Sequence, residues 1–291
     1  MLKTSALACL ALTLAFAAGP AHAVAEAAAT ATLAVGTVTA VALDGSSRAL
    51  HDGDTVYSGE QIETGDQSYA DLVFTDGGAI TLRPDTRFSI ENYHYDEIAH
   101  LADTEPDESA TPVPADEEAE APPAPQENAF FKLIKGGLRA VSGLIGHVQR
   151  DDYRMSTPVA TIGVRGTEYE ARYCGGDCGD EKDASGMPAD GLYTAVDDGA
   201  IGVTNESGET VSRKGQYTFV QYARARAVLS GTRPHALRHM ELPKRYRALV
   251  KRRRERLMRA RVARRHKLLK EYRAKHPAKA KRPHRRRKGG G

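Results

Sequence analysis

The segment 156–173, STPVATIGVRGTEYEARY, constrains the fold more than any other part of the chain. Its first half is rich in Val and Ile, and in its second half apolar or small residues alternate with Glu and Arg. A period of two residues is typical of a strand with one buried face. Pro158 fits the entry to a strand, and Gly166 indicates a bend or a close backbone approach. The segment predicts β-structure and carries no catalytic motif.

Short strand-like segments separated by turn signals flank this stretch. Asp44-Gly45 and the run 75–78, TDGG, have the composition of tight turns. Residues 33–43 and 69–82 supply the strands around them, whereas the Ala-rich residues 24–32 are expected to be a loose N-terminus. Many short strands with frequent turns predict an all-β fold, as a sandwich, a roll or a β-helix-like stack.

Several motifs in order give the chain a resemblance to a known family. Residues 42–93 contain a Gly-Asp pair, an I-x-T-G step, an A-x-L-x-F-x-D-G hairpin and L-x-P-x-T. Residues 130–143 contain L-x-x-G-x-L-R, and the central segment contains TPVATIGVRGTEY. Together these segments resemble the FecR domain, which implies a β domain over residues 33–222.

The FecR family includes inner-membrane sensors that regulate sigma factors in iron-siderophore signalling. Such sensors have a cytoplasmic anti-sigma segment and a transmembrane helix before the periplasmic domain, and neither is recognisable in this sequence. The resemblance therefore implies the domain alone. One implied role is a signalling component that contacts an outer-membrane receptor or another periplasmic protein, and the other is a structural or ligand-binding module.

The N-terminal residues 1–23 have the pattern of a cleavable signal peptide. Lys3 precedes a short apolar run, and Ala21-His22-Ala23 forms an A-x-A cleavage site. The apolar run is shorter than the roughly 20 residues that a membrane span needs. We expect export to the periplasm or secretion beyond it, with no span in the mature chain.

The charge is divided unequally along the chain. Residues 224–291 hold 27 of the 41 Lys and Arg residues and 3 of the 38 Asp and Glu residues, a net charge of +24. The remaining residues carry 14 basic and 35 acidic side chains, a net charge of −21. Residues 96–127 hold 11 acidic and no basic residues and are rich in Pro. This composition predicts a disordered insert within the β domain.

The basic tail, residues 223–291, is expected to contain a helix over about 242–275. Leu, Ala, Arg and Lys favour a helix, Pro243 fits its first turn, and Pro277 fits its end. An apolar stripe of helical spacing is predicted from Leu242, Tyr246, Leu249, Val250, Leu257, Met258, Val262, Leu268, Leu269 and Tyr272.

A basic amphipathic helix is typical of proteins that bind anionic surfaces. The candidate binding residues of the tail are Arg252, Arg253, Arg254, Arg264 and Arg265. The expected partner is an anionic envelope polymer or a lipid surface, since an exported chain is not expected to meet intracellular nucleic acid. Two alternatives stay open: a solvated tail without a partner, and a tail covered by the acidic insert. Arg165 and Thr167, beside Gly166, are further candidates, unless Arg165 forms hydrogen bonds within the β domain.

Two cysteines remain after removal of the signal peptide, Cys174 and Cys178. In an oxidising compartment a local disulfide is expected. A redox-active pair is the alternative, but the C-x-x-C spacing and the thioredoxin-like context of such a pair are both missing. The acidic residues that follow do not match a calcium loop, and His94, Asp96 and His100 lack a second ligand cluster. The sequence therefore predicts no metal and no cofactor.

No serine-hydrolase, zinc-protease or phosphate-loop motif occurs in the sequence. The expected function is that of an exported, non-enzymatic binding or structural module with a cationic tail. A signalling component is the first alternative, and an enzyme of unrecognised type is the second.

Overall fold

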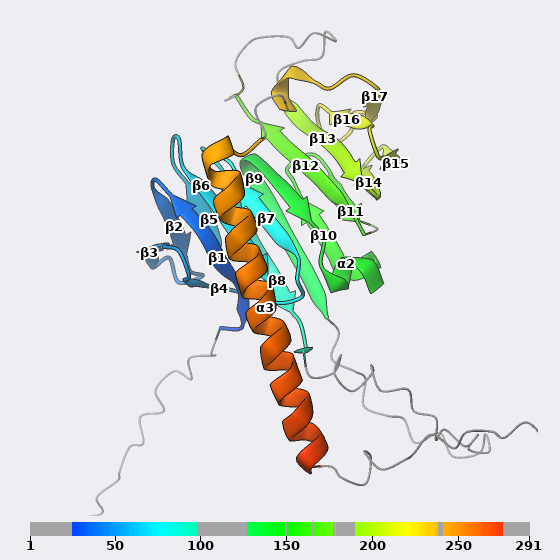
Figure 1. Ribbon diagram of the computed structural model, residues 1–291. Helices are drawn as coiled ribbons and strands as arrows, with labels where there is room; N and C mark the ends of the chain where they lie inside the picture. Colours follow the sequence, from blue (N-terminus) through cyan, green and yellow to red (C-terminus); the bar gives the residue numbers. More distant parts are fainter. Residues whose placement is uncertain are drawn as a thin grey trace, which may run out of the picture.

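The computed structural model describes residues 25–97, 127–148, 150–164, 166–176, 178, 190–237 and 241–275. Two β-sheets pack face to face, and a long C-terminal helix lies across the outer face of one of them (Figure 1). This arrangement confirms the predicted all-β class with a C-terminal helix. Of the three architectures expected, the sandwich is the one observed.

The two sheets, named sheet A and sheet B, have antiparallel neighbours except where β9 pairs with β10. In order, sheet A contains β4 (Thr55–Tyr57), β1 (Ala27–Val35), β6 (Tyr69–Phe74), β7 (Ala79–Leu82), the second half of β9 (Asn128–Val141), β12 (Glu168–Cys174), β13 (Gly191–Asp198), β16 (Tyr217–Val220) and β17 (Val228–Ser230). Sheet B contains β3 (Ser47–Ala49), β2 (Val38–Val41), β5 (Gln61–Thr64), β8 (Arg87–His94), the first half of β9, β10 (Tyr153–Ser156), β11 (Thr161–Val164), β14 (Ala200–Asn205) and β15 (Gly208–Arg213).

Strand β9 belongs to both sheets and joins them. Its residue Lys135 pairs with β8 in sheet B, and the next residue, Gly136, pairs with β12 in sheet A. Gly136 has a φ of 81°, a conformation that other residues adopt only with strain. A Cβ atom at this position would lie 2.6 Å from the carbonyl oxygen of Asp85 and from the Cα of Thr86. The strand can pass between the sheets because a glycine stands there.

Aromatic side chains from both sheets fill the space between them. The ring of Phe131 in β9 lies 5.0 Å from that of Phe74, 5.6 Å from those of Phe88 and Tyr153, and 6.3 Å from that of Tyr93. All five side chains are at most 5% exposed. Burial of each such side chain contributes about 1.5–3 kcal/mol to folding, so this cluster is a main source of the sandwich's stability.

The central segment forms β10, β11 and β12, as the sequence predicts, with Pro158 in the turn before β11. The prediction of a loose N-terminus over residues 24–32 is wrong. Strand β1 begins at Ala27 and pairs with β4 and β6. Ala residues are depleted in strands, but Ala28 and Ala31 are fully buried in this one. Tertiary packing overrides the local preference.

The helical elements are α2 (Leu144–Val148), the 3-10 turns η1 (Arg150–Asp152) and η2 (His235–Leu237), and α3 (Lys244–Lys275). The bounds of α3 agree with the helix expected over residues 242–275. No helix in the described part of the chain is both long enough and apolar enough to cross a membrane. The expected signal peptide and residues 98–126 of the acidic insert lie outside the described residues.

Candidate functional site

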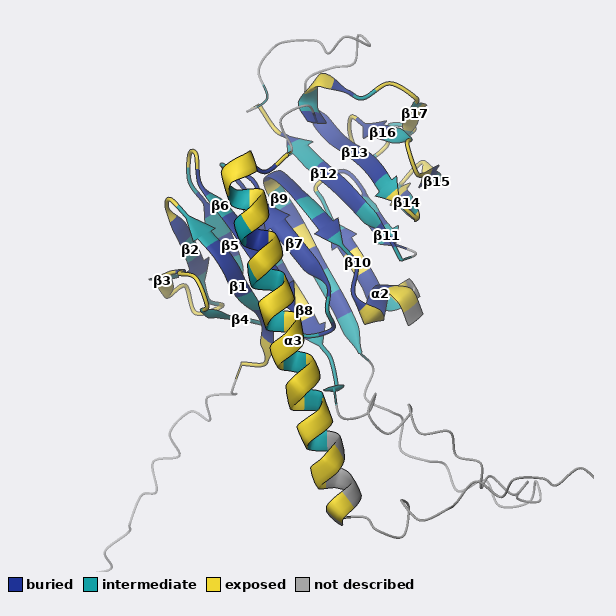
Figure 2. Ribbon diagram, viewed as in Figure 1, coloured by how far each residue is buried: buried dark blue, intermediate teal, exposed yellow. Residues whose placement is uncertain are grey.

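Helix α3 packs with its first half against the outer face of sheet A (Figures 1 and 2). Its N-terminal residues form an apolar cluster with β1 and β6, in which the rings of Tyr246 and Tyr69 are 5.8 Å apart. Leu33 of β1 and Val250 of α3 are 1% and 7% exposed within this cluster. The sequence predicts a solvated tail or a surface binder, and docking of the helix on the β domain was not among the expectations.

A buried ion pair fixes the helix further along. Asp71 in β6 is fully buried, and its carboxylate accepts a hydrogen bond of 2.9 Å from Nε of Arg254 and a second from Nη2. The hydroxyls of Thr32 and Thr81 also donate to this carboxylate, the latter at 2.7 Å. A buried carboxylate is tolerated only when its lone pairs are matched by donors. The four donors around Asp71 meet that requirement.

Two other arginines of α3 bind the backbone of the sheet. Arg253 donates to the carbonyl oxygen of Thr32 at 2.8 Å and forms an ion pair of 2.7 Å with Asp52. Arg261 donates to the carbonyl oxygens of Val73, at 3.2 Å, and Phe74. These contacts extend the docked part of the helix, named here the docked half, from Lys244 to Arg261.

The predicted apolar stripe is confirmed in the first turns of the helix, at Leu242, Tyr246, Leu249 and Val250. Further on, Leu257 and Leu268 are half-buried, and the side chains of Leu269 and Tyr272 lie outside the described ones. Met258 and Val262 were expected on the apolar face, yet they are 41% and 52% exposed. Arg254 and Arg261 occupy the contact face instead, at the helical spacing that continues from Val250. The outer face of sheet A presents Asp71 and main-chain oxygens at this point, and guanidinium groups match these acceptors better than apolar side chains do.

The remainder of α3, residues 262–275, extends past the edge of the β body and is named the projecting half (Figures 1 and 2). Arg264, Lys267 and Lys270 are exposed there. Lys267 lies 3.9 Å from Glu271, one turn further on, and an exposed pair of this kind neutralises little charge. The projecting half therefore presents cationic side chains to solvent.

A second charged cluster lies beside the helix on sheet A. Glu170 in β12 is 1% exposed and pairs with Arg139, at 2.9 Å, and with Arg233. Arg139 also pairs with Glu168 at 2.9 Å and with Asp197 at 2.7 Å. Desolvation is the largest single influence on the pKa of Arg139 and lowers it. The three acids together outweigh this effect, so the pKa is raised above its usual value. The cluster links β9, β12, β13 and the segment before η2.

The candidate residues of the tail take three different positions. Arg253 and Arg254 are used within the molecule, whereas Arg252 and Arg264 are exposed and Arg265 is half-buried. The structure thus brings Arg253 and Arg254 to the sheet, not to a surface with the others. Binding of an anionic partner by any of these five residues stays a prediction.

Thr167 is 2% exposed and therefore does not lie on an open surface. Its hydroxyl donates to the carbonyl oxygen of Ala200 at 2.6 Å, and its amide donates to the hydroxyl of Ser142 at 2.9 Å. These bonds give Thr167 a structural role. Arg165 lies outside the described residues, so the proposed contacts of this pair stay predictions.

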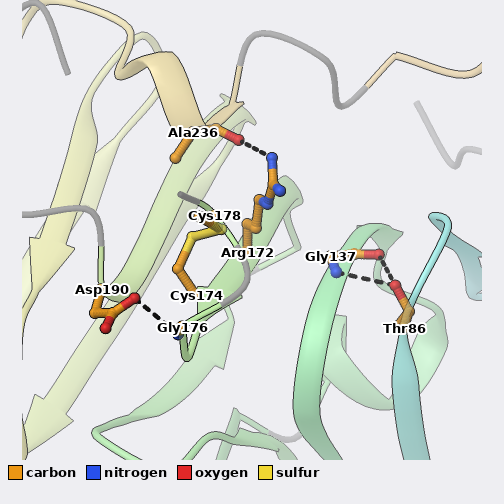
Figure 3. Close-up of a disulfide and its surroundings, with 8 residues drawn as sticks. All are labelled: Thr86, Gly137, Arg172, Cys174, Gly176, Cys178, Asp190 and Ala236. Carbon is orange, nitrogen blue, oxygen red and sulfur yellow. Dashed lines mark hydrogen bonds between the residues drawn. A yellow bond between two sulfur atoms is a disulfide. The ribbon is translucent and has the colours of Figure 1, made fainter. Parts of the chain in front are cut away.

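Cys174 and Cys178 form a disulfide, as expected from the sequence (Figure 3). Cys174 ends β12 and is 1% exposed. Beside the bridge, the amide of Gly176 donates to Asp190 at 2.9 Å, and Arg172 donates to the carbonyl oxygen of Ala236 at 2.9 Å. The bridge and the bond to Asp190 hold the end of β12 near the start of β13, and the bond from Arg172 joins β12 to η2.

Replacing both cysteines with Ala is expected to lower the free energy of unfolding by about 2 kcal/mol or less, because the closed loop is short. Urea denaturation followed by circular dichroism measures this loss. The unaltered protein with and without a reducing agent is the control. A loss well above this range would show that the bridge organises more of the fold than its own loop.

The histidine and aspartate residues considered as metal ligands do not form a site in the described structure. His94 lies 2.9 Å from Glu26 through Nδ1, which is a pair and not a cluster. Among the described residues no group of three or more His, Cys, Asp or Glu side chains could hold a metal ion. His100 lies outside the described residues.

Two buried charged residues of this region, Asp71 and Arg83, are 0% and 4% exposed and were not identified from the sequence. Strand β6 is buried along its whole length except at Tyr69, which is half-buried. A strand covered on both faces has few polar residues, so an acid within it requires a partner. The single acid in this apolar run was the signal that could have identified Asp71. Arg83 occupies the first unspecified position of the L-x-P-x-T motif, so the motif did not single it out.

A scan of protein-family models and a search of curated proteins gave no match for this chain. Two crystal structures of a candidate anti-sigma factor from Parabacteroides distasonis ATCC 8503 are similar at 11% identity and a TM-score of 0.37. The similarity covers 58% of this chain and 58% of that one. A cell surface anchoring domain is similar at 29% identity over 21% of this chain and 82% of its own, with a TM-score of 0.21.

The expected receptor or sensor partner stays a prediction. The likeness of this chain to the FecR domain rests on its sequence motifs.

Proposed function

We propose that this chain is a non-enzymatic binding protein of the bacterial envelope, in which a FecR-like β sandwich carries a cationic arm. The arm is the projecting half of α3, and its partner is an anionic envelope polymer or an anionic lipid surface. The observation that supports the proposal is the division of α3 into two parts. The docked half fixes the direction of the helix, and the projecting half holds exposed basic side chains away from the β body.

The docking contacts give the arm an energetic advantage over a free tail. An isolated helix with so many like charges is only marginally stable. The ion pair between Arg254 and Asp71 and the apolar cluster hold the first turns of α3 in helical form, so that the projecting half continues a helix that has already been nucleated. Less conformational entropy is then lost when the arm binds.

Removal of three charges from the projecting half is expected to weaken binding to anionic surfaces. The variant Arg264→Gln/Lys267→Gln/Lys270→Gln should bind vesicles that contain phosphatidylglycerol roughly 100-fold less tightly, since each basic residue near such a surface contributes about 1 kcal/mol. Vesicle co-sedimentation measures this affinity, and lipopolysaccharide in a parallel assay separates lipid from polymer. Binding should also weaken as salt is added.

The docked half supplies the matched control. Arg252, Arg256 and Arg259 are exposed on the part of α3 that lies over the sheet. The variant Arg252→Gln/Arg256→Gln/Arg259→Gln removes the same charge from the same helix and should keep most of the affinity. Equal binding by both variants and the unaltered protein would contradict the proposal. Equal losses in both would indicate a diffuse charge effect without a defined arm.

A further inference from the structure

A cleft of about 450 Å³ lies between the docked half of α3 and the outer face of sheet A. It is separate from the projecting half. Basic side chains from both walls line it, namely Arg83, Arg139, Arg247, Lys251 and Arg254, and two acids, Glu241 and Glu255, also contribute to its lining. An excess of positive charge in a concave site concentrates anions there.

Ion pairs within the protein account for most of these charges. Arg254 is bound to Asp71, and Arg139 is bound to Glu168, Glu170 and Asp197. Arg247 pairs with Glu241 at 3.1 Å, and Glu255 lies 3.7 Å from Arg259. Arg83 and Lys251 therefore remain as the cations of the cleft for which the described residues provide no ion pair.

The environment of Arg83 is unusual for a guanidinium group. The residue follows β7, where its amide donates to the carbonyl oxygen of Gly137 at 2.9 Å, and it is only 4% exposed. Its Nε and Nη1 atoms are buried and have no hydrogen-bond partner among the described residues. Desolvation lowers the pKa of Arg83 to about 10, with Glu170 opposing the shift, so the group is still protonated at neutral pH.

A buried cation with unused donors is costly unless a ligand or ordered water completes its bonding. Glu170 does not fill this role, because its oxygens accept from Arg139 and Arg233 and neither Nε nor Nη1 of Arg83 is bonded to it. The open cleft beside Arg83 offers the required space, and Lys251 lies on its opposite wall. Oxyanions form charge-assisted hydrogen bonds with guanidinium and ammonium groups.

We propose that this cleft binds an oxyanion, a phosphate or carboxylate group, between Arg83 of the sheet and Lys251 of the helix. The ligand would complete the bonding of Arg83 and would contact α3 and sheet A together. The site is distinct from the cationic arm and does not depend on it.

Isothermal titration of the full mature chain with inorganic phosphate and with acetate, in a chloride buffer, tests this site. Saturable binding is expected, and Arg83→Met should weaken it at least tenfold, since hydrogen bonds to charged groups are strong. Arg83→Lys keeps the charge and should retain an intermediate affinity. Arg226→Met makes the same change at an exposed arginine outside both the cleft and the cationic arm, and should leave the affinity for phosphate unaltered. Vesicles containing phosphatidylglycerol provide a second binding assay. Weaker vesicle binding by Arg83→Met would identify a lipid headgroup as the source of the oxyanion.

Thermal unfolding distinguishes this site from a structural role of Arg83. Without an oxyanion, Arg83→Met should unfold at the same or a higher temperature than the unaltered protein, because the variant lacks a buried charge with unused donors. With phosphate, only the unaltered protein should gain stability. Absence of saturable binding, or equal gains in both proteins, would overturn the proposal, and so would a variant that is destabilised equally with and without phosphate.

Discussion

Replacement of Arg254 with Leu is expected to release helix α3 from sheet A while the sandwich remains folded. The variant leaves the buried carboxylate of Asp71 without its cationic partner, and breaking a buried ion pair costs about 3–5 kcal/mol. Undocking of the helix would return Asp71 to water and relieve this cost. The stability that the variant loses is therefore limited to the free energy of docking the helix on sheet A. Hydrogen exchange should show lower protection in residues 244–261 and unchanged protection in β12.

Arg252 provides the control for this experiment, because it is exposed on the same helix. Arg252→Leu makes the same chemical change and should leave protection unaltered. The double variant Asp71→Val/Arg254→Leu removes both charges and should recover docking, since apolar groups often replace a buried ion pair without loss of stability. If Arg254→Leu alone retained full protection, the apolar cluster around Tyr246 would be sufficient to hold the helix.

The strands could be predicted from the sequence where alternation and turn residues agree. The hairpin between β6 and β7 turns at residues 75–78, and Gly77 there has a φ of 92°. Local chemistry specifies such a turn completely. The limits of α3 were predicted for the same reason, because helix-favouring composition and Pro243 both act locally. Strand β1 was missed because its small Ala side chains have a low strand preference.

The docking of α3 could not be predicted, because its partners are distant in sequence. Asp71 and Arg254 are 183 residues apart, and no local pattern specifies such a contact. An arginine-rich helix has the composition of a solvated or surface-binding segment. Only the tertiary fold shows that some of its arginines replace apolar residues at the interface. The cleft has the same origin, since Arg83 and Lys251 lie on opposite sides of that interface.

The glycine of the L-x-x-G-x-L-R motif has a role that the sequence did not reveal. Gly136 lies where β9 leaves sheet B and enters sheet A, and both the amide and the carbonyl of the adjacent Gly137 are bound to the hydroxyl of Thr86, at 3.0 Å (Figure 3). The crossing is held tightly, so the chain cannot move aside for a larger residue. The two sheets depend on this one position for their connection through β9.

Gly136→Ala is accordingly expected to lower the free energy of unfolding by about 3 kcal/mol or more. A left-handed conformation costs a residue with a Cβ atom roughly 1–2 kcal/mol. The new Cβ would also lie 2.6 Å from backbone atoms of Asp85 and Thr86, and overpacking adds about 1–3 kcal/mol. Urea denaturation followed by circular dichroism gives the change directly.

Two other glycines separate these contributions. Gly45 has a φ of 82°, and an added Cβ there would meet no atom within 4 Å, so Gly45→Ala should show only the conformational cost, about 1 kcal/mol. Gly163 in β11 has similar space without a positive φ, and Gly163→Ala should be neutral or stabilising by up to about 1 kcal/mol. If Gly136→Ala were no more harmful than Gly45→Ala, the close approach at the crossing would be of no energetic consequence. The expected order instead places Gly136 first by a wide margin, because strain and steric overlap act there together.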